Sequence, residues 1–249
     1  MSGYGGFARV YDRLTENVPY AEMARQIVSY TERFGGKKGI LLDLACGTGS
    51  LSEELARQGF DVIGVDSSEE MLNCALDKKF DSGLPIQYLR QDMRSLDMFG
   101  TIDVTVCTLD GINHLASCED VLKAFERVSL FCDPDGLFIF DVNTLHKHRD
   151  VLADNAFIYS LDGLYCGWQN EYDPADCSVR IFLDIFEEYD GKYERCSEDF
   201  REIYLPHEEI TALLEKAGLE LLAVYDNYTD EPTTETSERA VYVCKKVKS

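Results

Sequence analysis

The run Ile40-Leu41-Leu42-Asp43-Leu44-Ala45-Cys46-Gly47-Thr48-Gly49-Ser50-Leu51 decides the fold that we predict for this chain. Its apolar first half predicts a buried strand, and Ser50 is placed to open a helix. Gly47 and Gly49 lack a Cβ, so the backbone between the two elements can turn with positive φ and a ligand can lie against it. The free N–H groups of a helix start favour a negative group. The run therefore predicts a ligand-binding loop.

Two acidic residues narrow the class of ligand. Asp43 lies four residues before Gly47, and Asp66 lies nineteen residues after Gly47. A carboxylate at the second spacing lies at the end of the next strand, where it can accept hydrogen bonds from both hydroxyl groups of a ribose. A dinucleotide fingerprint would place a third glycine at Ser52, so the run departs from that fingerprint.

The composition counts against several classes of partner. The chain has 249 residues, 45% of them apolar, and a formal charge of −22 from 46 acidic and 24 basic residues. Binding nucleic acid or anionic lipid needs a basic footprint, so we expect neither partner. Nine cysteines without CxxC pairs indicate reduced thiols. We find no signal-peptide pattern and no apolar run of membrane length, which predicts a cytoplasmic protein.

Strands and helices alternate between residues 40 and 148. We predict strands at 40–45, 61–66, 86–90, 102–108 and 136–142, helices at 50–58, 68–78 and 118–132, and a turn at Pro134-Asp135-Gly136. This alternation predicts a parallel sheet, in which ligands bind at the carboxyl ends of the strands. Polar residues fall at these ends, namely Asp43, Asp66, Asp92, Asp110, Asp141 and Asn143. We therefore expect one shared site.

Three of the four histidines have candidate roles. His114 follows the fourth predicted strand and can take a proton from an incoming amine or hydroxyl. Alternatively, it is a helix-start residue with a local backbone bond. His146 and His148 resemble a metal pair, but no carboxylate ligands are evident nearby. We interpret them as a solvated helix start and predict no metal site.

Residues 149–205 alternate with a period of two and are divided by turn signals, which predicts an inserted antiparallel sheet. The segment 150–205 carries 14 Asp or Glu and 4 Lys or Arg, together with many aromatic residues. Such a sheet over a ligand cavity suits a small acceptor that can be cationic. Alternatively, most of the acids are only its solvated face. A helix from Pro206 to Lys216 and two strands, at 219–227 and 239–246, complete the chain, and we expect the last strand to be antiparallel.

Residues 1–36 begin with a glycine-rich tip and continue to a helix that Gly35-Gly36 ends. The tyrosines of this segment, Tyr4, Tyr11 and Tyr20, are either packing aromatics or part of a lid over the ligand.

The wording Asp-Leu-Ala-Cys-Gly-Thr-Gly at 43–49 resembles the first motif of class I S-adenosylmethionine-dependent methyltransferases. The resemblance covers nearly the entire chain and departs at Ala45-Cys46, where a glycine often stands. It implies an α/β fold, a Rossmann-like seven-stranded sheet with the last strand antiparallel, plus an inserted antiparallel sheet. Segments 7–12 and 112–115 are similar to small-molecule N-methyltransferases that act on amino sugars or glycine.

The resemblance implies S-adenosyl-L-methionine as cofactor and a division into an N-terminal helical lid (1–36), a binding core (37–148 and 206–249) and an acceptor cap (149–205). It places Asp92 on the adenine amino group and Met93 on the ring, while Asp92 and Ser67 can alternatively be helix caps. The expected cofactor-binding residues are Tyr11, Tyr20, Asp43, Ala45, Gly47, Gly49, Asp66, Ser67, Met71, Asp92, Met93 and Leu109. His114 and Tyr4 are the expected catalytic residues.

Three functions are compatible with these residues. The first is methyl transfer by in-line displacement to a small-molecule acceptor, with nitrogen favoured over oxygen as the methylated atom. The second is methylation of protein or RNA on the same fold, although the acidic composition counts against RNA. The third is binding of S-adenosylmethionine without catalysis. We expect a monomer or a homodimer.

Overall fold

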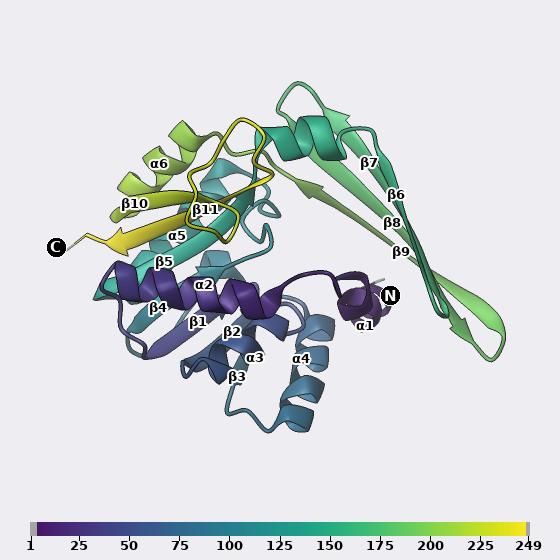
Figure 1. The fold of residues 1–249 in the computed structure, drawn as a ribbon, viewed down its shortest axis with the longest axis horizontal. Coiled ribbons are helices and arrows are strands. Elements are labelled where there is room, and N and C mark those ends of the chain that lie inside the picture. The colour runs from purple at the N-terminus through teal and green to yellow at the C-terminus, as the bar shows by residue number, and fades with distance from the viewer. Residues whose placement is uncertain (1–3, 248–249) are drawn as a thin grey trace.

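The computed structural model describes residues 4–247, which form a seven-stranded sheet and a separate four-stranded sheet (Figure 1). The strand order of the large sheet is β10-β11-β5-β4-β1-β2-β3, and β11 runs antiparallel to both neighbours. This confirms the predicted fold class. The large sheet contains β1 (Ile40–Leu44), β2 (Asp61–Asp66), β3 (Gln87–Arg90), β4 (Ile102–Cys107), β5 (Cys132–Asn143), β10 (Leu219–Asp226) and β11 (Arg239–Lys246).

Helices pack on both faces of this sheet. They are α2 (Tyr20–Arg33), α3 (Ser50–Arg57), α4 (Glu69–Ser82), α5 (Cys118–Phe131) and α6 (His207–Lys216), with a short 3-10 turn, η1 (Met93–Ser95). Helix α1 (Tyr4–Leu14) lies instead against α4 and the four-stranded sheet. Apolar side chains of α5 and α6 share one buried cluster, and those of α2 and α3 share another. Neighbouring strand residues, such as Leu41 and Leu42, alternate between the two clusters because successive side chains point to opposite faces. The sheet is therefore buried on both sides.

The predicted turn at Pro134-Asp135-Gly136 is wrong. Strand β5 already begins at Cys132, which pairs with Ile102, and the next pair joins Leu137 to Val104. The turn residues lie in the irregularity between these two pairs. They form a bulge on the longer strand instead of a reversal of the chain.

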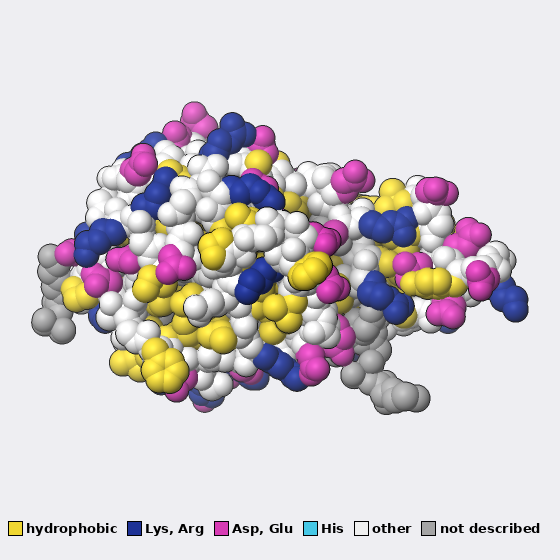
Figure 2. All heavy atoms as spheres, turned by 90° about the horizontal axis from the view of Figure 1, so that it is seen from below, with side chains coloured by type: hydrophobic (Ala, Val, Ile, Leu, Met, Phe, Trp, Pro, Cys, Tyr) yellow, Lys and Arg dark blue, Asp and Glu magenta, His cyan; other side chains and the backbone are white. Residues whose placement is uncertain are grey.

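The inserted segment forms the predicted antiparallel sheet, which extends away from the core in Figure 1. A π-helical turn, η2 (Lys147–Leu152), leads into β6 (Ala156–Leu161), β7 (Leu164–Asp173), β8 (Ser178–Tyr189) and β9 (Lys192–Glu202). One face buries an apolar cluster with Val10 of α1. The other carries cross-strand ion pairs such as Arg180–Asp199 and Arg195–Asp184, and Figure 2 shows basic and acidic side chains intermixed on this part of the molecule. Many acids of the insertion are therefore its solvated face.

Helix α1 joins the two sheets. The carboxylate of Asp12 accepts hydrogen bonds from Thr48 (2.7 Å) and Ser50 (3.1 Å) beside the glycine loop, and it pairs with Lys78 of α4. On the other side, Arg9 lies 3.7 Å from Glu187 of β8. The helix thus contacts the core and the inserted sheet at once.

No helix among residues 4–247 is long and apolar enough to cross a membrane. All nine cysteines are free thiols.

Replacement of Gly49 by alanine should destabilise the fold more than the same change at Gly83. Both residues have positive φ, +77° and +68°, which costs an alanine about 1–2 kcal/mol. An added Cβ at Gly83 would meet nothing within 4 Å, whereas one at Gly49 would collide with the hydroxyl of Tyr88. Overpacking adds about 1–3 kcal/mol. Urea unfolding of both variants measures the difference, and equal losses would contradict the predicted steric contact.

Candidate functional site

A cavity of about 730 Å³ is lined by the carboxyl ends of the parallel strands, by α1 and by the inner face of the inserted sheet. Its volume suits a ligand of cofactor size. Most residues predicted for the site line it, namely Tyr11, Tyr20, Asp43, Ala45, Gly47, Asp66, Ser67, Met71, Asp92, Met93, Leu109 and His114. Gly49 is not among its lining residues. The side chain of Tyr4 lies outside the described part of the chain, so its catalytic role stays a prediction.

The two glycines of the loop have different structural roles. Gly47 has a φ of +54° and lines the cavity, and a Cβ added there would meet no atom within 4 Å, so its outer side is open. Gly49 is the residue before α3 and lies behind the loop against Tyr88. Ala45 also has positive φ, +59°, which is uncommon for a residue with a Cβ. This is the position at which the sequence departs from the family motif, and the backbone there keeps a conformation that suits glycine.

Asp66 connects the glycine loop to the next helix. Its two carboxylate oxygens accept hydrogen bonds from the backbone N–H groups of Gly47 and Ser68, each at 2.8 Å. Burial raises the pKa of Asp66, although these backbone hydrogen bonds oppose the rise. Each oxygen can accept a further hydrogen bond from a ligand hydroxyl. The cap of α4 is Ser68, whose hydroxyl accepts from Met71 N, so the alternative of a capping role for Ser67 is wrong.

Asp92 caps a helical turn, which was the alternative prediction for it. Its carboxylate caps the short 3-10 turn by accepting from the backbone of Arg94 at 2.9 Å, and it also pairs with the Arg94 guanidinium. The hydrogen bond from Arg94 lowers the pKa of Asp92. Asp92 and Met93 still line the cavity, so capping does not remove them from it.

The loop after β4 is held by a buried carboxylate. Leu109 and Asp110 both have positive φ, +53° and +57°, and their N–H groups donate to Asp141 at 2.8 Å and 2.7 Å. Tyr228 and Arg239 also donate to Asp141, and Arg239 reaches Asp110 at 2.7 Å. Sequence reasoning missed Tyr228 and Arg239, since each lies more than eighty residues away along the chain and in no recognised motif.

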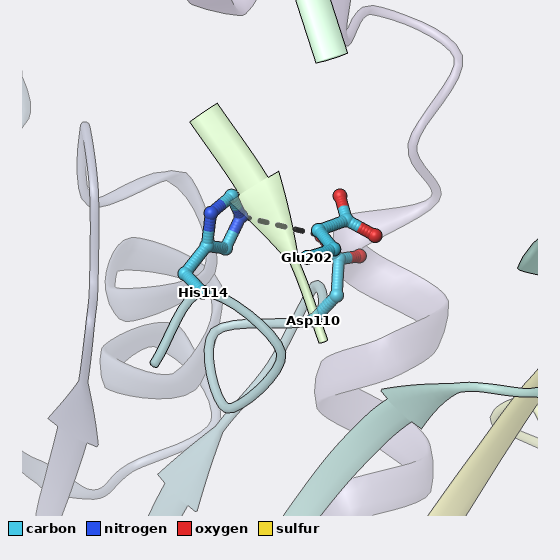
Figure 3. Close-up of side chains that lie close together, drawn as sticks. All are labelled: Asp110, His114 and Glu202. Carbon is cyan, nitrogen blue, oxygen red and sulfur yellow. Dashed lines mark ion pairs between the residues drawn. The ribbon is translucent and has the colours of Figure 1, made fainter. Parts of the chain in front are cut away.

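Three ionisable groups meet beside this loop. Nε2 of His114 lies 3.6 Å from the carboxylate of Asp110, and Glu202 lies at the end of β9. One side-chain nitrogen or oxygen atom of each of the three residues lies within 4.8 Å of the others (Figure 3). Burial lowers the pKa of His114, but the hydrogen bond and charge of Asp110 and the charges of Glu202 and Asp66 outweigh it, and the net pKa is raised above 6.5. The side chain of His114 is 42% exposed and lines the cavity.

The inserted sheet supplies a second wall that residue-level prediction did not identify. Its inward side chains at the cavity include aromatic rings and two buried acids, namely Tyr159, Trp168, Phe200, Glu198 and Glu202. The alternation of β9 could have shown that the two glutamates share a face, since they lie four residues apart. It could not show which face is buried.

The interpretation of His146 and His148 as a solvated helix start is wrong for His148. That side chain is fully buried, with Nδ1 2.9 Å from Cys177 O and Nε2 3.5 Å from Glu202. His146 lies on the surface beside Asp150, at 3.0 Å. Carboxylates therefore do lie near both histidines, although the chain spacing gave no sign of Glu202.

The stability of the Asp43→Asn variant relative to the native chain should change with pH. Burial raises the pKa of Asp43 to about 7, with Ser52 opposing and Asp66 adding to the rise, so the folded state binds more protons than the unfolded state above about pH 4. The native chain therefore loses stability from this group as the pH rises from about 4 to about 7. Asparagine does not titrate and can still accept a hydrogen bond from Ser52. The free energy of unfolding of the variant should therefore rise relative to that of the native chain as the pH increases from about 4 to about 7. Denaturant unfolding at several pH values measures it, and a constant difference would contradict the assignment.

The sequence and the fold are both similar to those of known methyltransferases. A family described as "Methyltransferase domain" matches residues 41–136. "Putative methyltransferase YqeM" of Bacillus subtilis (strain 168) is 35% identical over 99% of this chain and 98% of that protein. A glycine/sarcosine N-methyltransferase of Halorhodospira halochloris is 31% identical over 51% of this chain and 47% of that protein.

The crystal structure of an S-adenosylmethionine-dependent methyltransferase from Clostridium acetobutylicum ATCC 824 superposes with a TM-score of 0.89. It is 31% identical, and the match covers 99% of this chain and all of that one. The full-length sequence match and this superposition extend the agreement from the binding motif to both sheets. The chain therefore belongs to the class I S-adenosylmethionine-dependent methyltransferases, and its cofactor is S-adenosyl-L-methionine.

Proposed function

We propose that this protein transfers the methyl group of S-adenosylmethionine to a nitrogen atom of a small-molecule amine. The observation that carries the proposal is the cavity wall formed by the inserted sheet, which carries Trp168, Phe200, Glu198 and Glu202. Aromatic faces and carboxylates both attract a cationic amine. The similarity to a glycine/sarcosine N-methyltransferase over half of the chain supports nitrogen as the acceptor atom.

The residues at the strand ends fit the cofactor chemically. Asp66 keeps acceptor capacity for ribose hydroxyls, the open side of Gly47 leaves room for a ligand against the backbone, and Met93 offers an apolar surface for an aromatic base. Bound in this place, S-adenosylmethionine supplies a methyl group that the positive charge of its sulfonium already activates. Tyr11 and Tyr20 line the same cavity from α1 and α2, and we propose that residues 1–36 cover the cofactor as a lid.

His114 is the proposed proton acceptor. An ammonium ion has no free electron pair, so the acceptor nitrogen must lose a proton before it can act as a nucleophile. Neutral His114 can take that proton at Nε2, and the imidazolium that forms is stabilised by Asp110 at 3.6 Å. The inserted sheet, as the proposed acceptor cap, helps to exclude water and to hold the acceptor against this side chain.

The Asp66→Asn variant should bind S-adenosylmethionine about 10- to 100-fold more weakly, since a charge-assisted hydrogen bond contributes about 1.5–3 kcal/mol. Isothermal titration calorimetry measures the affinity. Asp61→Asn is the matched control, because Asp61 is the exposed acid at the other end of the same strand and should bind the cofactor as the native chain does. Equal affinity of the two variants would argue against the ribose role of Asp66.

The rate of methyl transfer should fall as the pH drops through the raised pKa of His114, because only the neutral imidazole can accept a proton. His114→Asn should lower turnover at least tenfold and lose this acidic limb, with unchanged cofactor affinity.

The assay follows tritiated methyl groups into a pool of small amines, with protein and RNA fractions counted separately. Label found mainly in protein or RNA would refute the small-molecule proposal. Cofactor binding without any transfer would indicate a binding protein.

A further inference from the structure

Strand β9 carries three glutamates at four-residue intervals in different environments. Glu194 is exposed, whereas Glu198 and Glu202 are 8% and 4% exposed and line the cavity. Phe200 lies between the two buried acids on the same face of the strand and contacts the ring of His114, with 5.0 Å between centroids. Two carboxylates and an aromatic ring therefore face the cavity from one strand.

One carboxylate oxygen of Glu198, Oε1, is buried and accepts no hydrogen bond from the described residues, although the side chain lines the cavity. A buried polar atom left unpaired costs free energy, and a charged one costs more. Burial raises the pKa of Glu198, with the charge of Glu70 adding to the rise. A ligand in the cavity that brought a hydrogen-bond donor and a positive charge would remove this penalty.

Glu202 is held in place by two buried groups. Its Oε2 accepts from Nδ2 of Asn143 at 2.8 Å and lies 3.5 Å from Nε2 of His148. A carbonyl oxygen only accepts, so Nδ1 of His148 must carry the proton that it donates to Cys177 O. The buried Nε2 makes no hydrogen bond. The amide of Asn143 is an uncharged partner, so the carboxylate can still attract a cation from the cavity.

We propose that Glu198 and Glu202, together with Trp168 and Phe200, form a subsite that recognises the positively charged nitrogen of the methyl acceptor. This inference rests on the proposed function and deepens it, because it selects acceptors that enter as cations and disfavours neutral and anionic ones. Glu202 lies within 4.8 Å of His114, so a nitrogen bound there can reach the proposed proton acceptor.

An organic cation fits the group formed by Asp110, His114 and Glu202 better than a metal ion does. Arg239 already lies 2.7 Å from Asp110, so one of the three possible metal ligands is paired with a fixed positive charge. The indole N–H of Trp168 donates to Asn170, which fixes the ring in the same wall of the cavity. Aromatic faces attract alkylammonium groups.

Trp168 is the only tryptophan of the chain, so its fluorescence reports on this wall alone. The experiment titrates benzylammonium and its neutral isostere benzyl alcohol into the full chain saturated with S-adenosylhomocysteine. The native protein should bind benzylammonium at least tenfold more tightly than the alcohol. Glu202→Gln and Glu198→Gln should each weaken benzylammonium binding about tenfold and leave the alcohol unaffected. Glu194→Gln is the matched control and should retain the native preference.

Equal affinity for the two probes in the native protein, or a native preference in both buried variants, would overturn the proposal. Thermal unfolding and cofactor calorimetry on each variant show whether it is folded. A variant that fails to fold is replaced by Glu198→Met or Glu202→Met, which also removes the charge and should weaken benzylammonium binding in the same way. The titration involves no methyl transfer. A negative result in the titration would therefore refute the subsite without refuting methyl transfer to an amine. A negative result in the transfer assay would refute the proposed function without refuting the binding preference.

Discussion

The buried carboxylate of Asp141 fixes the conformation of the loop after β4, which lines the cavity. It accepts hydrogen bonds from two backbone N–H groups, a tyrosine hydroxyl and a guanidinium, and it has no exposed surface. Two of the donors, Leu109 and Asp110, have positive φ, which costs of order 1–3 kcal/mol for each residue unless the surroundings compensate. Asp141 supplies that compensation. It thereby sets where Asp110 and His114 lie.

The same carboxylate depends on the unusual strand of the sheet. Arg239 is the first residue of β11, the antiparallel strand, whose pairing with β5 aligns Val241 with Asp141. The guanidinium pairs with Asp110 and Asp141 at once, which matters because an unpaired buried charge is strongly destabilising. The topology that distinguishes this fold from an all-parallel one is therefore also what brings a positive charge to these two carboxylates.

Local signals in the sequence were enough to predict the fold and most of the strand-end residues that line the cavity. The run from Ile40 to Leu51 contains a strand, a turn and a helix start in the correct order, and the spacing to Asp66 placed a carboxylate at the end of the next strand. These features depend on residues that are close along the chain. The bulge in β5 was mistaken for a turn, because Pro134 and Gly136 are typical of both.

The wall that the inserted sheet forms could not be predicted in the same way, because its contacts join distant parts of the chain. Glu202 meets Asn143 and His148 only after the inserted sheet has folded over the core, and nothing in their spacing indicates it. Gly47 and Gly49 illustrate the same limit at short range. Both are glycines in one motif, and only the packing of Tyr88 shows that one faces the cavity and the other the interior.

Helix α1 has a consequence for how the two substrates enter. It is tied through Asp12 to the glycine loop and Lys78, and it packs on the inserted sheet through Val10 and Arg9. One rigid element thus forms part of the wall for donor and acceptor alike. A ligand at the glycine loop that shifts this helix therefore also shifts the wall at the inserted sheet. Binding at the two places is then coupled through α1, and by thermodynamic linkage the coupling is the same in both directions.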